Sequence, residues 1–215
     1  MIYSKETARE TANNLLQIKA IKLSYSTPFQ WASGWKAPIY CDNRKTLSFP
    51  EVRNNLRDRM SEIIRQEYAA ADVIAGVATG GIALGVLVAQ QLNLPFVYVR
   101  SSQKGHGLQN RVEGVLQPNQ KAVVIEDLVS TGKSSLNAVD ALRNSEVTVL
   151  GMISIFDYGF DVARQNFDDK SCSLYSLSDY EALLEVALQE NYIQKDESES
   201  LTSWRKNPEN WGRNQ

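Results

Sequence analysis

Two consecutive carboxylates precede a short polar loop in the segment VVIEDLVSTGKSS, which runs from Val123 to Ser135. Four apolar residues come first, then Glu126 and Asp127, then a stretch rich in Ser, Thr and Gly that leads into a helical pattern. Carboxylates accept hydrogen bonds from neighbouring sugar hydroxyls, and a loop before a helix N-terminus offers backbone N–H groups to a phosphate. The segment therefore predicts a site for a ribose phosphate.

The final Gly-Lys-Ser of this segment also occurs in the P-loop of ATP-binding proteins, but the spacing excludes that alternative. A P-loop has a glycine five positions before the glycine of Gly-Lys-Ser, and here that position is Asp127. A carboxylate there would face phosphate oxygens at close range. The other alternative is a plain strand-to-helix turn with incidental acids, which we disfavour because every element of a sugar-phosphate site is adjacent.

The composition is that of an ordinary globular chain. Its 215 residues are 43% hydrophobic and 22% charged, with a formal net charge of -2. We expect one domain, 1–215, and no general attraction to nucleic acid or to an anionic membrane. Without a signal-peptide pattern or a membrane-spanning run, the sequence predicts a cytoplasmic protein. Cys41 and Cys172 match no metal spacing, and no protein metal site is predicted.

Apolar runs alternate with helical patterns along most of the chain. We expect strands at 72–78, 94–100, 121–127, 146–156 and 172–178, and helices at 7–21, 51–68, 82–92, 134–144, 161–167 and 179–190. Continuous apolar strands joined by helices are typical of an α/β fold with a parallel sheet covered on both faces. The segment from about 22 to 50 is rich in aromatic and turn residues, so it predicts a small lobe of short strands beside a core at about 70–180.

The segment 123–135 resembles the phosphoribosyl pyrophosphate (PRPP) signature of the type I phosphoribosyltransferases. Three further segments resemble the orotate phosphoribosyltransferase family: FQWASGWKAPIYCDNRKTLSFPEVR its N-terminal hood, GVATGGIALG its pyrophosphate loop, and YVRSSQKGHGLQNRVEG its mobile catalytic loop. They follow the family's order over most of the chain from 29 to 135. The resemblance implies the type I phosphoribosyltransferase fold, a central parallel sheet flanked by helices with a small N-terminal hood.

The resemblance also implies an activity, the transfer of the 5-phosphoribosyl group from PRPP to orotate in pyrimidine synthesis. It implies Mg²⁺ as the cofactor and a homodimer with shared active sites. A phosphoribosyltransferase for a purine or another base would share the PRPP signature but lack SGWKAPIYCDNR. A PRPP-sensing regulator that binds nucleic acid would be expected to carry a basic patch or a DNA-binding module, and the sequence shows neither.

Residues in each of these segments are candidates for binding PRPP or orotate. Glu126 and Asp127 would hold the ribose hydroxyls, with Asp127 also near the cationic sugar ring. Lys104 would be the main catalytic residue, because a cation can stabilise the charge that develops on the leaving diphosphate. The other candidates for PRPP are Arg100, His106, Leu128, Val129, Ser130, Thr131, Gly132, Lys133 and Ser134, those for the diphosphate are Thr79, Gly80 and Gly81, and those for orotate are Ser130, Tyr40 and Lys36.

Several of these residues have a structural alternative. Tyr40 could fill the core, and Thr79 to Gly81 could be a tight strand-to-helix turn without a ligand. Two positions also differ from better-known members of the family. Gly80 replaces a lysine, and Asp157-Tyr158-Gly159 stands where an arginine contacts the base carboxylate. Lys36 and Arg44 are the cations available for that carboxylate.

Overall fold

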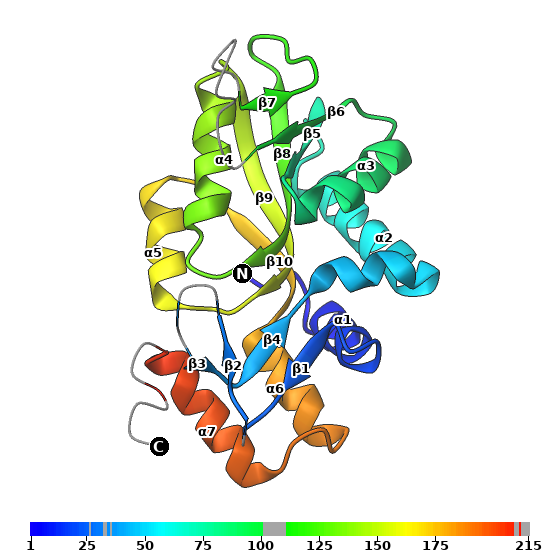
Figure 1. The fold of residues 1–215 in the computed structure, drawn as a ribbon. Helices are drawn as coiled ribbons and strands as arrows, with labels where there is room; N and C mark the ends of the chain where they lie inside the picture. The colour runs from blue at the N-terminus through cyan, green and yellow to red at the C-terminus, as the bar shows by residue number, and fades with distance from the viewer. Residues whose placement is uncertain (26, 32–33, 35, 101–110, 209–210, 212–215) are drawn as a thin grey trace.

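A six-stranded sheet forms the centre of the molecule (Figure 1). The computed structural model describes residues 1–25, 27–31, 34, 36–100, 111–208 and 211. The strand order is β10-β9-β8-β5-β6-β7, and all neighbours pair in parallel except β7, which is antiparallel to β6. The strands are β5 (Val73–Val77), β6 (Phe96–Val99), β7 (Val112–Glu113), β8 (Lys121–Val129), β9 (Thr148–Asp157) and β10 (Leu174–Asp179).

Helices cover both faces of this sheet. One face packs against α2 (Pro50–Glu67) and α3 (Gly80–Leu92), and the other against α4 (Lys133–Arg143) and α5 (Asp161–Asp169). Neighbouring residues of a strand point to opposite faces, so Val123 and Ile125 join the core beneath α3 while Val124 joins the core beneath α4. This double burial explains the continuous apolar runs, and it confirms the predicted α/β fold with a parallel sheet covered on both faces.

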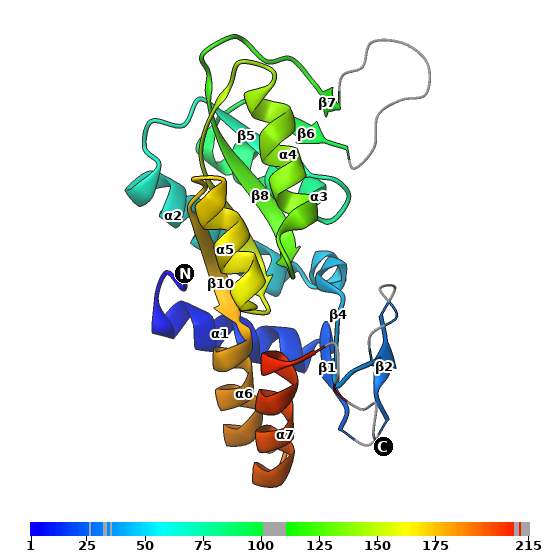
Figure 2. The ribbon, with the colours of Figure 1, turned by 90° about the vertical axis from the view of Figure 1, so that its left-hand side faces the viewer.

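The hood is built from short elements near the N-terminus. In this lobe β1 (Ile21–Leu23) pairs antiparallel with β4 (Ile39–Cys41), and β2 (Phe29–Gln30) with β3 (Lys36–Ala37). A 3-10 helix, η1 (Asn43–Ser48), follows β4 and leads to α2. Short strands and loops were predicted for this segment; the 3-10 helix was not. In Figure 2, β1, β2 and β4 lie below the carboxyl end of β8.

Both ends of the chain complete this lower part of the molecule. The helix α1 (Lys5–Gln17) packs against α6 (Tyr180–Gln189), and α7 (Lys195–Lys206) packs beside α6 (Figure 2). The last predicted helix ends at residue 190, so α7 is an element that was not predicted. A capping box joins Gln194 and Glu197 at its N-terminus, and this local pattern was the available signal. No helix of the described residues is both long and apolar enough to cross a membrane.

Trp204 of α7 connects the hood to the sheet. Its side chain is fully buried, and its ring centroid lies 5.6 Å from that of Trp31 in the hood. It lies 6.0 Å from Tyr158 and 5.6 Å from Phe160, which follow β9, and 5.4 Å from Tyr180 of α6. Because aromatic rings at these separations bury large apolar surfaces, the cluster holds α7, the hood and the end of β9 together.

Replacing Trp204 therefore tests the structural role of α7. We expect Trp204→Ala to lower the free energy of unfolding by about 3–5 kcal/mol, since it removes a large buried ring and leaves a cavity. Urea unfolding followed by circular dichroism measures the change. Tyr192→Ala is the control, because Tyr192 is 48% exposed. Equal, small losses in both variants would contradict the packing of α7 described here.

Candidate active site

The predicted loops meet where the order of the strands reverses. From β5 the chain continues to β6 on one side, whereas β8, β9 and β10 follow one another on the other side. In open α/β sheets, ligands bind outside the carboxyl ends of the strands at such a reversal. The turn Thr79–Gly81 follows β5, and the loop 130–132 follows β8. The sheet topology thus brings the predicted diphosphate loop and the predicted phosphate loop together at one edge of the sheet, which the carboxyl ends of the strands form.

The turn after β5 lies in direct contact with the end of β8. A Cβ added to Gly80 would overlap the carboxylate of Asp127, and one added to Gly81 would overlap the carbonyl oxygen of Ile125. At Gly81 only glycine lets the two backbones approach this closely without a shift of β8, whereas a side chain at Gly80 would require the Asp127 carboxylate to move. A longer side chain in place of Gly80 would occupy the space beside Asp127. The structure therefore places two of the predicted segments side by side, while their ligands stay predictions.

Glu126 and Asp127 differ in their surroundings, although both were predicted to hold ribose hydroxyls. Glu126 is 5% exposed and points toward α4, where Ser135 Oγ donates a hydrogen bond to its Oε2 at 2.8 Å. The backbone N–H of Asp127 donates to its Oε1 at 3.0 Å. Burial, and then the neighbouring Asp127, raise the pKa of Glu126 to about 8. Asp127 is partly exposed beside Gly80, so it is the acid that faces the loops.

The loop after β8 is supported from below by α5. Asn166 Nδ2 donates a hydrogen bond to the carbonyl oxygen of Thr131 at 2.9 Å. Gly132 has a φ of 77°, and a Cβ there would lie 2.8 Å from the ring of Phe167. A left-handed backbone beside a packed ring requires glycine at this position. Asn166 and Phe167 were not predicted as supports, because they lie more than thirty positions further along the chain.

The predicted phosphate ligands surround this loop. Ser130 and Thr131 are partly exposed, and Lys133 and Ser134 are exposed in the first turn of α4. Their backbone N–H groups lie at a helix N-terminus, the part of a helix that attracts anions. Val129 is fully buried and Leu128 is partly buried, so any contribution of Val129 would come from its backbone.

The hood brings further candidates to the same edge. Tyr40 is 42% exposed, and its ring centroid lies 5.7 Å from that of Phe29. Lys36 is exposed on β3, and Arg44 forms an ion pair with Asp42 at 2.7 Å. A hood residue that was not predicted makes the direct link to β8: Asn43 Nδ2 donates a hydrogen bond to the carbonyl oxygen of Asp127 at 2.6 Å.

Of the predicted loop cations, the structure describes Arg100. It follows β6, and its Nη1 lies 3.4 Å from Glu113 Oε1 across the β6–β7 pair. Lys104 and His106 lie outside the described residues. Their proposed contacts therefore stay predictions.

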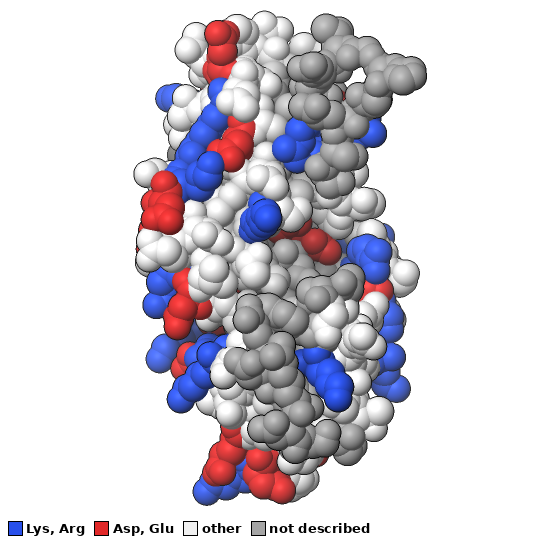
Figure 3. Space-filling view, turned by 60° about the vertical axis from the view of Figure 1, so that its left-hand side comes forward, with Lys and Arg blue, Asp and Glu red and all other residues white. Residues whose placement is uncertain are grey.

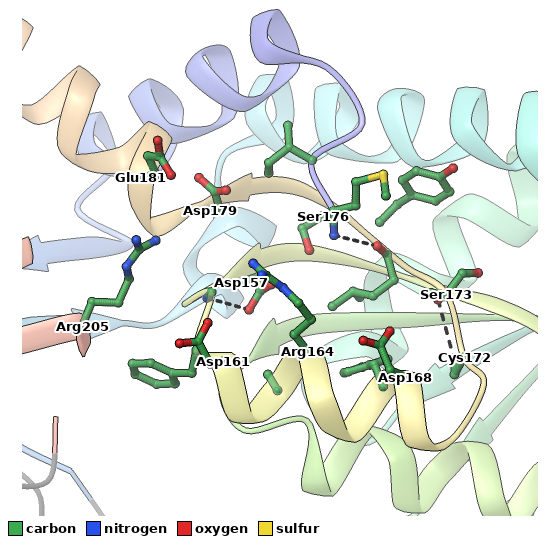
Figure 4. A pocket seen from close by; sticks show the side chains of 18 residues that line it. Asp157, Asp161, Arg164, Asp168, Cys172, Ser173, Ser176, Asp179, Glu181 and Arg205 are labelled. Atoms are coloured by element: carbon green, nitrogen blue, oxygen red, sulfur yellow. Dashed lines mark hydrogen bonds between the residues drawn. The ribbon is translucent and has the colours of Figure 1, made fainter. Parts of the chain in front are cut away.

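A separate pocket of about 610 Å³ lies between α5, β10, α6 and α7 (Figure 4). Asp157 and Asp179 line it from adjacent strands, and Arg164 and Arg205 line it from helices. The backbone N–H of Gly159 donates to Asp157 Oδ1 at 2.9 Å. No residue of 79–81 or 126–135 lines this pocket, so it is distinct from the edge where the predicted loops meet.

Charged side chains of both signs are interspersed on the face shown in Figure 3. On that face the described Lys and Arg residues form no extended patch of one sign. Within the described ranges there is also no group of three or more His, Cys, Asp and Glu residues that could hold a metal ion.

Comparison with known proteins identifies the family of this chain. The family model of the phosphoribosyl transferase domain matches residues 47–191. The chain is 53% identical over 208 residues to an orotate phosphoribosyltransferase of Porphyromonas gingivalis, an alignment that covers 97% of this chain and 99% of that protein. The chain belongs to the orotate phosphoribosyltransferase family.

Solved structures agree with this family assignment. An orotate phosphoribosyltransferase from Aeropyrum pernix has a TM-score of 0.74 and 27% identity, covering 85% of this chain and 99% of that one. A UMP synthase from Leishmania donovani has a TM-score of 0.78 and 22% identity, covering 94% of this chain and 42% of that one. The second likeness shows a shared fold. The P. gingivalis relative aligns with 97% of this chain. The alignment therefore includes most of the hood of this chain.

The raised pKa of Glu126 predicts a pH dependence of stability. Below its ordinary value of 4.5 the acid is protonated in both the folded and the unfolded chain. Between 4.5 and about 8 the unfolded chain releases this proton while the folded chain keeps it, so Glu126 lowers the free energy of unfolding as the pH rises. We expect Glu126→Gln to gain stability relative to wild type from pH 5 to pH 8, measured by urea unfolding at each pH.

The control for this comparison is Glu185→Gln, which removes an exposed carboxylate from α6. A stability difference between Glu126→Gln and wild type that stays constant from pH 5 to pH 8 would contradict a protonated Glu126 in the folded protein.

Proposed function

We propose that this protein transfers the 5-phosphoribosyl group of PRPP to orotate, giving orotidine 5′-monophosphate and diphosphate in pyrimidine synthesis. The observation that carries the proposal is the meeting of three elements at Asp127. The glycine turn after β5 touches its carboxylate, the phosphate loop follows it in the chain, and η1 of the hood binds its carbonyl oxygen. The relatives that share the whole chain, hood included, are named for orotate, and this supports the choice of base.

The chemistry assigns one task to each part of this edge. A ring nitrogen of orotate attacks C1′ while the bond from C1′ to the diphosphate oxygen breaks, and positive charge develops on the sugar. Asp127 would accept a hydrogen bond from a ribose hydroxyl and stabilise that charge more strongly in the transition state than in the ground state. The loop 128–134 would hold the 5′-phosphate, and Thr79 to Gly81 with Arg100 would hold the diphosphate.

Other groups would stabilise the leaving diphosphate and bind the base. Lys104 would offset the negative charge that develops on the leaving diphosphate, with His106 on the same loop. Orotate is already an anion, so its nitrogen needs little help from a general base, and none is assigned. Ser130 and Tyr40 would contact the base, and Lys36 and Arg44 are the hood cations within the described residues that its carboxylate could meet.

The donor groups at this edge fit Mg²⁺ held mainly by the substrate. Mg²⁺ takes oxygen ligands and is commonly bound through one or two carboxylates together with substrate phosphates. Asp127 offers one partly exposed carboxylate, and the described residues form no metal cage of their own. When bound, Mg²⁺ would neutralise part of the charge on the diphosphate.

The assembly and the location belong to the same proposal. The family resemblance supports a homodimer in which each active site takes its phosphate loop from one subunit and Lys104 from the other. A cytoplasmic location fits a biosynthetic enzyme with these substrates.

A panel of bases tests the proposed reaction. With purified protein, PRPP and Mg²⁺, we expect orotate to be consumed and orotidine 5′-monophosphate to form, while uracil, adenine, guanine and hypoxanthine stay unchanged. A chelator should stop the reaction and excess Mg²⁺ should restore it, because the diphosphate needs a counter-charge as it leaves. Chromatography of the products measures each reaction. Consumption of a purine without consumption of orotate would overturn the choice of base.

Mixing two strongly impaired variants tests the shared site. Lys104→Ala and Asp127→Asn are combined in equal amounts under conditions that allow subunits to exchange. In a shared arrangement each mixed dimer has one doubly damaged site and one intact site. Random exchange makes about half of the dimers mixed, so activity should return to roughly a quarter of the wild-type value.

One variant carries an affinity tag, so that subunit exchange can be measured. The untagged variant binds to the affinity resin only when it forms a mixed dimer with the tagged one. The two unmixed variants, treated in the same way, are the controls. Demonstrated exchange without any recovery of activity would show that each loop serves its own subunit.

A further inference from the structure

The end of β8 extends beyond its neighbour in the sheet. The pairing of β5 with β8 runs from Val73 opposite Ala122 to Gly76 opposite Ile125, whereas β8 continues to Val129. Asp127 therefore has no β5 residue opposite it. Its N–H donates to the side chain of Glu126, and its carbonyl oxygen accepts from Asn43 Nδ2 at 2.6 Å. The hood amide thus takes the place of a strand partner for a backbone group that needs one.

The amide of Asn43 is itself held in one orientation. Asn43 is 2% exposed, and Cys41 Sγ donates a hydrogen bond to its Oδ1 at 3.2 Å. Burial, and then Asp127 and Asp42, raise the pKa of the Cys41 thiol well above its ordinary value, so the thiol stays a donor. Because a thiol proton faces Oδ1, the opposite end of the amide, Nδ2, faces Asp127.

The same residue connects Asp127 to the wall where a base would bind. Asn43 begins η1, which comes directly after β4, and β4 carries the exposed Tyr40. Thr46 Oγ1 donates to the carbonyl oxygen of Asn43 at 2.6 Å and closes the turn of η1. A movement of β4 would therefore pass to the backbone of Asp127 through one buried amide.

We propose that Asn43 is a positioning residue for Asp127, one that sets the place of its carboxylate relative to the base held by the hood. The inference rests on the proposed function, because it assigns the Asp127 carboxylate to the transition state. Asn43 does not touch the reacting atoms in this account. It acts through the backbone of Asp127, where a displacement of about 1 Å costs up to about 100-fold in rate.

Kinetics of Asn43→Ala in the full-length protein test this role. We expect kcat for orotate to fall at least about tenfold, with less than about threefold change in either KM, because the loss falls on the transition state. Asn43→Ser, which is too short to reach Asp127, should give the same result and serves if the alanine variant folds poorly. Ser178→Ala is the matched control: Ser178 is fully buried and the change removes a hydrogen bond to the carbonyl oxygen of Ala8, a bond that involves neither Asn43 nor Asp127.

A double-mutant cycle separates positioning from a general structural role. In an Asp127→Asn background the carboxylate is already absent, so adding Asn43→Ala should lower the remaining activity by less than about twofold. Equal loss in both backgrounds, or the same loss of kcat in Ser178→Ala, would overturn the positioning role while the activity of the wild type stands. A wild type that fails to use orotate would overturn the proposed function, and this inference with it.

Discussion

The start of α3 lies so close to the end of β8 that a Cβ at Gly81 would overlap the carbonyl oxygen of Ile125, and one at Gly80 would overlap the carboxylate of Asp127. This contact sets the geometry of the whole edge. The pairing of β5 with β8 ends at Ile125, the last residues of β8 lie beyond it, and the Asp127 carboxylate lies beside Gly80. The hood can bind to β8 because the sheet no longer occupies that position, and Asn43 does so. Because the backbone groups of Asp127 need hydrogen-bond partners away from β5, they connect the predicted diphosphate turn, the acid pair and the hood.

The two adjacent acids are separated by the alternation of the strand. Glu126 points into the core beneath α4, and burial keeps it protonated at neutral pH, whereas Asp127 remains partly exposed toward the loops. Two charged carboxylates at this spacing would repel each other and an incoming diphosphate. A neutral Glu126 reduces that repulsion and still accepts hydrogen bonds from Ser135 and from the backbone of Asp127.

The sheet and the hood have different tasks in this family. A fold shared among phosphoribosyltransferases can hold PRPP, but the choice of base depends on residues added to it. In this chain the hood is completed by α1, α6 and α7, and a cluster of aromatic rings around Trp204 joins it to the end of β9. Tyr158 of that cluster belongs to the segment Asp157-Tyr158-Gly159, which stands where better-known members have an arginine. The position of the hood, which carries the proposed base contacts, is therefore tied to the packing of the C-terminal helix.

The sequence by itself determined five of the six strands of the central sheet, the acid pair and the glycine turns, because burial on both faces and tight turns leave local patterns in residue types. It also indicated the family, because segments such as 123–135 contain their functional residues next to one another in the chain. Only the tertiary structure decided that Asn43 reaches Asp127, 84 positions away, and that Asn166 supports the loop at Thr131. It also decided the burial of Glu126 and of Trp204. These features depend on contacts between distant segments, and an asparagine in a polar stretch carries no sign of its partner.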